Sequence, residues 1–209
     1  MEINHRNIFV IGDSISIHYG PYLEKMISDT FCYNRKGGLK EALIDLDNPV
    51  GSNAGDSKMV LKYLTDEFKK NTKYDVLLIN CGLHDIRVDR ESNKKQVSEN
   101  EYICNLDKIL NISKRMAHNI FWIESTPIID SLHNSRKEGF LRFSKDVEKY
   151  NKIAQELMLK NNIPVIPLYK FTKKLGGKEV YSDHAHFTKE IRMLQAAFIT
   201  GFLYNFFQK

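Results

Sequence analysis

An apolar run near the start of the chain, cut short by a glycine, limits the choice of fold more than any other stretch. Residues Ile8–Ile11 are all large and apolar, and Gly12-Asp13-Ser14 follows them directly. Such a run is typical of a strand that is buried on both faces. Helical spacing of apolar residues begins at about Tyr19 and predicts a helix to Ser28. We therefore expect a strand, a tight turn and a helix.

The position of Ser14 after this strand allows two roles. Proteins with alternating strands and helices place their chemistry at the carboxyl ends of strands. The free N–H groups and the dipole of a helix N-terminus favour negative charge there. A serine at this place can act as a nucleophile, and its own N–H can help to bind an oxyanion. Alternatively, Ser14 or Asp13 only caps the helix.

Four further apolar segments predict strands, and helical patterns separate most of them. The predicted strands are Phe31–Asn34, Tyr74–Cys81, Ile120–Glu124 and Pro164–Leu168. The predicted helices start at Asp56 or Ser57, run from a Ser98-x-x-Glu101 capping box to Ala117, and cover Lys145–Lys160 and Thr188–Phe207. Polar loops are expected up to Pro49 and over Ile128–Ser144, the latter with a binding or lid function.

This alternation predicts an α/β fold, a three-layer α/β/α sandwich with a mainly parallel sheet of five strands. The 209 residues contain no internal repeat, low-complexity tract or interdomain linker, so residues 1–209 are expected to form one domain. No apolar run is long enough to span a membrane, and the N-terminus lacks the pattern of a signal peptide. We therefore expect a cytoplasmic protein without a membrane partner, although a chain whose signal had been removed would look the same.

Charge and cysteine content exclude some function classes. The net charge of +5 comes from basic residues that are mostly mixed with acidic ones, as in residues 66–70, which predicts a solvated surface and no nucleic-acid partner. The three cysteines, Cys32, Cys81 and Cys104, are odd in number and lack the spacing of metal ligands. Cys32 and Cys81 lie in apolar segments and are expected to be buried free thiols.

A turn rich in histidine precedes the last predicted helix. Asp183 stands three residues before His186, and Thr188 follows as the expected cap of the helix. A carboxylate at this spacing can orient the imidazole and stabilise the imidazolium that forms when histidine takes a proton from serine. The same turn could instead hold a metal ion, and the ligands would then be Asp13, Asp183, His184 and His186.

Taken together, the first and last of these blocks resemble the SGNH hydrolases of the GDSL esterase/lipase superfamily. Gly12-Asp13-Ser14 is similar to the Gly-Asp-Ser turn of that family, and Asp183–Thr188 is similar to its Asp-x-x-His block. The resemblance covers nearly the whole chain and implies a flavodoxin-like sheet. It also implies that Ser14 is the nucleophile, that His186 is the base, that Asp183 orients it, and that no cofactor or metal is required.

The resemblance further implies an oxyanion hole made by Ser14, Gly55 and His84. Gly55, in Asn53–Ser57, matches a glycine whose N–H binds the oxyanion. The third block of the family is usually Gly-x-Asn-Asp, but this chain has Gly82–Asp85, so His84 replaces the usual asparagine. An imidazole N–H can also donate a hydrogen bond, and it does so more strongly when the ring is protonated.

The implied activity is the hydrolysis of short-chain acyl esters, with acetyl esters expected and a carbohydrate as the carrier, as for many compact members of the family. Arg35, Asn134 and Arg136 are the expected contacts to a small-molecule or carbohydrate ester substrate. Three alternatives remain open. They are an acyltransferase with the same triad, a non-catalytic carbohydrate-binding member of the family, and a metal-dependent hydrolase.

Overall fold

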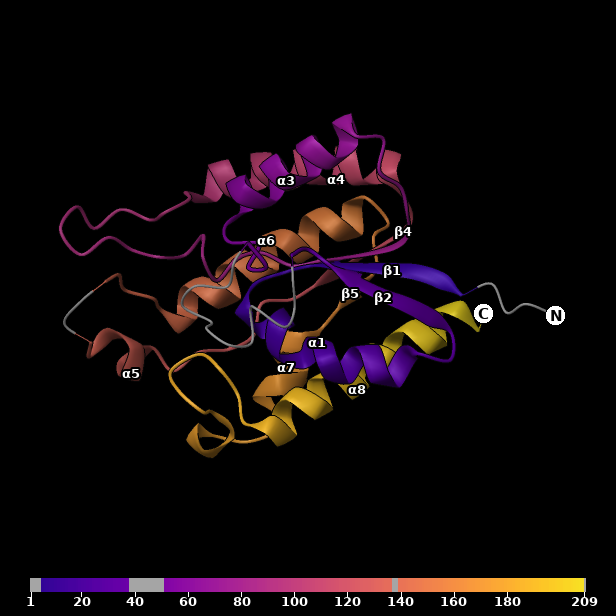
Figure 1. The fold of residues 1–209 in the computed structure, drawn as a ribbon. Helices are drawn as coiled ribbons and strands as arrows, with labels where there is room; N and C mark the ends of the chain where they lie inside the picture. The colour runs from indigo at the N-terminus through magenta and orange to yellow at the C-terminus, as the bar shows by residue number, and fades with distance from the viewer. Residues whose placement is uncertain (1–4, 38–50, 137–138, 209) are drawn as a thin grey trace.

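The computed structural model describes residues 5–37, 51–136 and 139–208, and within them five strands form a parallel sheet (Figure 1). The order is β2-β1-β3-β4-β5, and every neighbouring pair is parallel. This is the flavodoxin-like order. The strands are β1 (Arg6–Ile11), β2 (Phe31–Arg35), β3 (Tyr74–Ile79), β4 (Ala117–Ile123) and β5 (Val165–Ile166). The predicted fold class is confirmed.

Helices cover both faces of this sheet. On one face α1 packs against α8, and on the other α3 packs against α4 and α4 against α6 (Figure 1). These helices are α1 (Ser14–Ile27), α3 (Ser57–Lys69), α4 (Glu99–Met116), α6 (Ser144–Lys160) and α8 (Lys189–Phe207). The first and last helices of the chain therefore lie side by side.

Side-chain caps decide where three of the helices begin. Asp13, Asp56 and Ser98 accept hydrogen bonds from backbone N–H groups in the first turns of α1, α3 and α4. The cap at Asp13 starts α1 at Ser14, earlier than the apolar spacing from Tyr19 predicts. Because of this difference, Ser14 is the first residue of a helix and not part of a loop before it.

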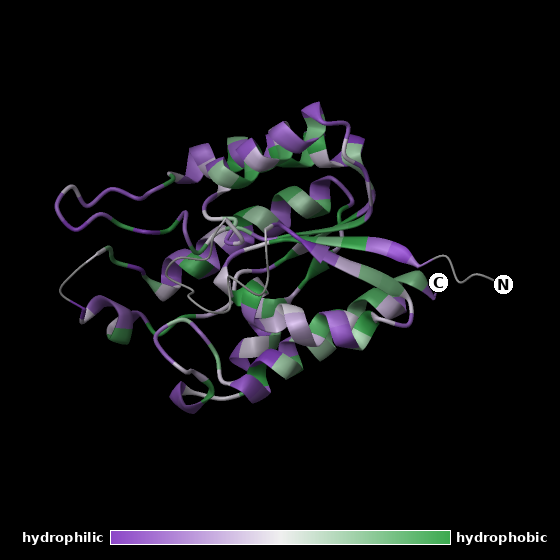
Figure 2. Cartoon of the chain, viewed as in Figure 1, coloured by the Kyte–Doolittle hydropathy of each residue, from purple (hydrophilic) through white to green (hydrophobic). Residues whose placement is uncertain are grey.

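The core lies between the sheet and the inner faces of the helices, where Figure 2 shows hydrophobic residues along the strands. Successive side chains of the edge strand β2 point to opposite faces of the sheet, and their burial alternates accordingly. Cys32 is on its exposed side, so the prediction of a buried thiol there is wrong; Cys81 is buried as predicted, and Cys104 is exposed.

Two short helices and a 3₁₀ turn depart from the predicted elements. They are α5 (Asp130–Asn134), α7 (Leu168–Lys173) and η1 (Lys178–Val180). The predicted loop after Ile128 thus contains a helix, and the strand predicted from Pro164 ends two residues early because α7 begins at Leu168. The loop predicted to run to Pro49 lies mainly in residues 38–50, outside the described part. Across the described ranges, no helix combines the length and apolar composition that a membrane crossing needs.

Candidate active site

The turn that carries Ser14 is held tightly at the carboxyl end of β1. A Cβ atom on Gly12 would lie 2.9 Å from both Cβ and Oγ of Ser16, so this close approach needs a glycine. Asp13 is only 2 % exposed, and its carboxylate accepts a hydrogen bond from Ile15 N at 3.0 Å. Because Ser14 is the first residue of α1, its backbone N–H is one of those without an acceptor inside the helix.

A short loop before α8 carries the other two triad candidates. Tyr181 and Phe187 pair as an antiparallel bridge, and Ser182 N donates to the carbonyl of His186 at 2.9 Å. These contacts close the loop on itself, so Asp183 and His186 lie side by side. Thr188 occupies the N-cap position of α8, but its side chain makes no capping hydrogen bond.

The structure brings Ser14, His186 and Asp183 into one chain of hydrogen bonds. Ser14 Oγ lies 2.8 Å from His186 Nε2, and His186 Nδ1 lies 2.7 Å from Asp183 Oδ2. A carboxylate can only accept, so Nδ1 carries the proton and Nε2 is free to accept the hydrogen bond of the serine hydroxyl. This is the tautomer that removes a proton from serine.

The charge of Asp183 is secured by its own loop. Burial alone would raise its pKa, but the hydrogen bond from the His186 ring and those from the backbone N–H groups of Ala185 and His186 hold that pKa well below its usual value. The carboxylate is therefore ionised at neutral pH. A second ring, that of His18, lies 4.9 Å from His186, and burial lowers the pKa of His18 to about 3, so it adds no positive charge beside the base.

The Asn53–Ser57 loop differs from the expectation that the N–H of Gly55 is free to bind an oxyanion. Gly55 has a φ of 70°, and a Cβ there would meet Met59 Sδ at 2.3 Å, so the position requires glycine. Its N–H, however, donates to the side-chain Oδ1 of Asn53 at 2.9 Å, and Asn53 rather than Gly55 lines the cavity beside Ser14. The sequence signal for Asn53 was its place in the small-residue loop, where an Asn often bonds the N–H two residues later.

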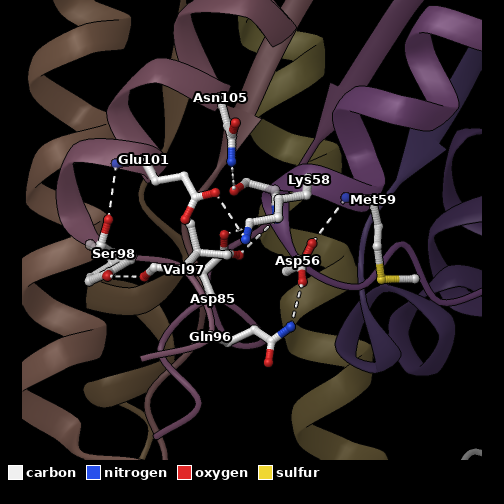
Figure 3. A network of polar contacts seen from close by, with 11 residues as sticks. Asp56, Lys58, Met59, Asp85, Gln96, Val97, Ser98, Glu101 and Asn105 are labelled. Atoms are coloured by element: carbon white, nitrogen blue, oxygen red, sulfur yellow. Dashed lines mark hydrogen bonds and ion pairs between the residues drawn. The ribbon is translucent and has the colours of Figure 1, made fainter. Parts of the chain in front are cut away.

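A buried polar network fixes this loop against the segment that follows β3 (Figure 3). Both carboxylate oxygens of Asp85 accept from Ser57 N, at 2.9 and 3.1 Å, and burial raises the pKa of Asp85 to about 6. Asp56 caps α3 through Met59 N and accepts a second bond from Gln96. Asp85 thus orders the Asn53–Ser57 loop.

The same network shows only half of the predicted capping box of α4. Ser98 Oγ accepts from Glu101 N at 3.3 Å, as a cap does. The Glu101 carboxylate instead forms an ion pair with Lys58 at 2.9 Å, which links α4 to α3 (Figure 3). The predicted start of α4 is correct, whereas the reciprocal bond of the box is replaced by this contact.

His84 lines the same cavity as Ser14. Burial lowers the pKa of His84 well below its usual value, and the charges of Arg87 and Arg142 lower it further. The ring is therefore neutral at physiological pH, so the stronger donation expected of a protonated ring does not operate. A neutral ring donates through one nitrogen only.

Ser14 and His186 open into a cavity of about 740 Å³. Three arginines line it, namely Arg87, Arg136 and Arg142, and of these only Arg136 was predicted as a substrate contact. Their segments lie after β3 and after β4, so no local spacing in the sequence brings them together. The one signal was the predicted binding function of the 128–144 segment, which contains Arg136 and Arg142.

Two of the predicted substrate contacts are structural instead. Arg35 is only 9 % exposed, and its guanidinium donates to the carbonyl of Ser52 at 3.0 Å and to Ser16 Oγ at 3.3 Å, because the alternation of β2 turns it toward α1. Asn134 donates to the carbonyl of Arg142 at 2.8 Å and accepts from Arg142 N at 2.9 Å. Neither side chain lines the cavity, and both predictions are corrected.

The proposed metal ligands do not converge. Within residues 5–37, 51–136 and 139–208, no group of three or more His, Cys, Asp or Glu side chains is arranged to hold a metal ion. Asp13 uses its carboxylate to cap α1, and Asp183 uses both of its oxygens on its own loop.

Comparison with known proteins identifies the fold. No family model matches the sequence, and no curated protein matches it either. Solved structures do match. A lipase/acylhydrolase from Enterococcus faecalis superposes with a TM-score of 0.70 at 20% identity, over 95% of each chain.

Two further structures share the fold at lower identity. The catalytic domain of a peptidoglycan O-acetyltransferase from Streptococcus pneumoniae has a TM-score of 0.60 at 16% identity, over 96% of this chain and 94% of that one. An acetylxylan esterase from Geobacillus stearothermophilus has a TM-score of 0.59 at 14% identity, over 95% and 94%. The resemblance to SGNH hydrolases is thus confirmed at the level of the fold, and the reaction has to be inferred from the residues.

Proposed function

We propose that this chain, which has the fold of the SGNH hydrolases, is a serine hydrolase that cleaves short-chain acyl esters, with acetyl esters preferred. The observation that carries the proposal is the unbroken relay from Ser14 Oγ through the His186 ring to Asp183, with distances of 2.8 and 2.7 Å. A nucleophile, a base and an orienting carboxylate in this order are what acyl transfer to serine needs. The relay also opens into a cavity that can hold a substrate.

The reaction follows from the relay. His186 Nε2 takes the Ser14 proton while Oγ attacks the carbonyl carbon, and the C=O bond opens to an oxyanion. The imidazolium, stabilised by Asp183, then gives its proton to the leaving oxygen, so the alcohol departs and an acyl-serine remains. Water, deprotonated by the same nitrogen, attacks the acyl-serine and releases the acid and Ser14.

Three donors are proposed for the oxyanion. The backbone N–H of Ser14 lies at the start of α1, and the side chains of Asn53 and His84 line the cavity. With Asn53 Oδ1 held by Gly55 N, the amide NH₂ remains as the donor of that side chain. The N–H of Gly55 would join the hole only after Asn53 had turned away.

The similar structures support acetyl groups on carbohydrate as the substrate class. One is an acetylxylan esterase and another is a peptidoglycan O-acetyltransferase. The second name also supports the alternative that a sugar hydroxyl, rather than water, takes the acyl group from Ser14. The intact relay gives no support to a non-catalytic role.

Hydrolysis of 4-nitrophenyl acetate, butyrate and octanoate tests the proposal. The parent should turn over acetate fastest, Ser14→Ala should lose about 10⁴-fold or more of kcat, and EDTA should have no effect. Ser28→Ala removes a hydroxyl near the other end of the same helix and is the matched control. Equal rates in the parent and Ser14→Ala would overturn the proposal.

The acyl acceptor is then identified by product analysis in the presence of methyl glucoside. Free acetate as the main product supports the hydrolase. Acetylated glucoside in excess of acetate supports the acyltransferase. A faster reaction with octanoate than with acetate would contradict the short-chain preference.

A further inference from the structure

Two arginines that line the cavity, Arg87 and Arg142, form no ion pair with any of the described residues. Arg142 is only 6 % exposed, and its Nε donates to the carbonyl of Leu83 at 2.7 Å. In the part of the chain that the structure describes, the terminal nitrogens of Arg142 and the whole guanidinium of Arg87 have no hydrogen-bond partner and no ion pair. These two arginines, together with Phe140, are called the arginine wall below.

An aromatic ring places both guanidinium groups of the arginine wall. The Arg87 guanidinium carbon lies 4.2 Å, and that of Arg142 4.8 Å, from the centre of the Phe140 ring. Burial and the nearby charge of Arg87 together lower the pKa of Arg142 to about 9, while Asp13 opposes the shift. Both groups are therefore cationic at neutral pH, and they repel one another.

Hydrogen bonds from α5 and a strand bridge hold the arginine wall in place. His133 Nε2 donates to the carbonyl of Phe140 at 3.0 Å, and the Asn134 amide brackets the backbone of Arg142. Val88 and Leu141 pair as an antiparallel bridge, which brings the residue after Arg87 beside the residue before Arg142. The position of the two cations is thus built by the protein and not by an internal ion pair.

A buried cation without a counter-ion is costly, so its retention beside a nucleophile calls for a partner from outside. Among the described residues that line the cavity, Asp13 alone carries a carboxylate, and this group is 2 % exposed and committed to the cap of α1. Arg136 adds a third cation to the lining. The described lining residues therefore include three arginines and one carboxylate.

We propose that the arginine wall binds an anionic group, a carboxylate or a phosphate, carried by the same ester whose acyl group Ser14 accepts. The inference rests on the proposed esterase function and names its substrate class. A planar guanidinium fork matches either group in a bidentate way. The rival explanation is that Arg87 and Arg142 only pack on Phe140, and the two explanations differ in what the charge does to substrate choice.

Matched esters distinguish the anion-binding explanation from the explanation that Arg87 and Arg142 only pack on Phe140. The substrates are methyl 4-acetoxybenzoate, which is neutral, 4-acetoxybenzoate, and 4-acetoxyphenyl phosphate. The parent should favour an anionic ester over the neutral one by tenfold or more in kcat/KM, mainly through KM, and high salt should reduce the preference. The two anionic arms show whether the wall accepts a carboxylate or a phosphate.

The variants are Arg87→Gln and Arg142→Gln, and each should reduce the ratio of kcat/KM for the anionic ester to kcat/KM for the neutral ester at least fivefold relative to the parent. Arg115→Gln is the matched control, because Arg115 also lies on an aromatic ring, 4.3 Å from the centre of Phe68, but outside the cavity. If Arg142→Gln does not fold, Arg87→Gln alone decides the question, since Arg87 is only half-buried. An unchanged preference in both variants would overturn the inference.

Direct binding provides a readout that does not need turnover. Benzoate and phenyl phosphate are titrated into Ser14→Ala by calorimetry, and at least one should bind with an affinity that Arg87→Gln lowers tenfold or more. Absence of binding by both overturns the arginine-wall inference. Serine-dependent cleavage of the neutral ester with no anion preference would refute anion binding by the arginine wall and leave the esterase proposal intact. Anion binding without any ester cleavage would refute the esterase proposal and leave anion binding by the arginine wall intact.

Discussion

The relay of Ser14, His186 and Asp183 and the arginine wall differ in whether their polar atoms have partners within the protein. In the relay of Ser14, His186 and Asp183, both ring nitrogens and both carboxylate oxygens have partners within the protein. In the arginine wall, the terminal nitrogens of Arg87 and Arg142 have none among the described residues. If the proposals hold, the proposed catalytic groups are positioned by the protein itself, while the proposed recognition groups are left for a substrate to pair.

The two walls also differ in how the sequence encodes them. Asp183 and His186 lie in one closed loop, so a four-residue motif predicts their contact. Arg87 and Arg142 come from separate connections that meet through the Val88–Leu141 bridge. A local motif can therefore reveal the first wall and not the second.

The largest expected effect comes from a substitution in the relay. Asp183→Asn should lower kcat by about 10³–10⁴-fold with little change in KM, because the amide no longer fixes the productive tautomer of His186. The fall in kcat is measured with 4-nitrophenyl acetate. Asp29→Asn, an exposed change near the end of α1, should leave kcat unaltered. A loss of less than tenfold in Asp183→Asn would mean that His186 needs no orienting carboxylate.

Asn53→Asp tests the proposed oxyanion donor of the Asn53 side chain. An aspartate can still accept the bond from Gly55 N, so the loop is kept, but it has no NH₂ to donate and adds repulsion toward an oxyanion. A loss of about 10²–10³-fold in kcat is expected. Asn71→Asp, at the end of α3, is the control. A rate equal to that of the parent would remove Asn53 from the oxyanion hole.

Substitution of His84 is expected to lower kcat less, because another side chain that donates a hydrogen bond can replace the imidazole. His84→Asn should keep a substantial part of the parent kcat, whereas His84→Ala should lose at least tenfold, since donation rather than the ring is what matters. Rates are compared at pH 6 and 8, where the neutral His84 predicts no gain in its contribution on the acidic side. Equal kcat in His84→Ala and the parent would refute the donor role.

Asn134→Ala sharpens the comparison at the arginine wall without touching a charge. Loss of both bonds to the Arg142 backbone should raise KM for the anionic ester about three- to tenfold, on the order of the one or two hydrogen bonds removed. The kcat for the neutral ester should not change. Asn111→Ala on the exposed side of α4 is the control. A uniform fall for both esters would assign Asn134 a purely structural role.

The smallest expected effect concerns stability in acid beside the relay. His18 has a pKa lowered by burial from 6.5 to about 3, so the unfolded chain binds its proton first and stability falls as the pH drops below 6.5. His18→Leu should therefore show a smaller fall in Tm between pH 7.5 and 5 than the parent. His118→Leu, at an exposed position of β4, is the control. Equal falls in the parent and His18→Leu would contradict this.

Much of the fold could be predicted because its signals are local. Continuous apolar runs marked β1 and β3, and side-chain caps marked the starts of α3 and α4. The missed helices α5 and α7 have no side-chain cap, so nothing in the sequence announces them. Cys32 was misplaced because its burial depends on which face of β2 is covered, and the sequence of the strand does not show this.

The residues of the candidate site also fall into those that a local motif predicts and those that it does not. The triad candidates came from motifs whose spacing fixes geometry, and the structure brings them within hydrogen-bond distance. Gly55 shows the limit of that approach, because the motif gives the backbone turn but not the neighbouring amide that occupies its N–H. Arg35 shows another limit, since strand alternation turned a polar candidate inward.

The contact between Ser14 and His186 joins residues 172 positions apart. A ribosome therefore synthesises Ser14 well before His186, and α1 can contact its neighbour α8 only after both have been made. An emerging chain holds a serine without a base, so it cannot become acylated through this relay while it is still being synthesised. Under the proposed function, acylation of Ser14 would thus report that α1 and the loop before α8 have come together.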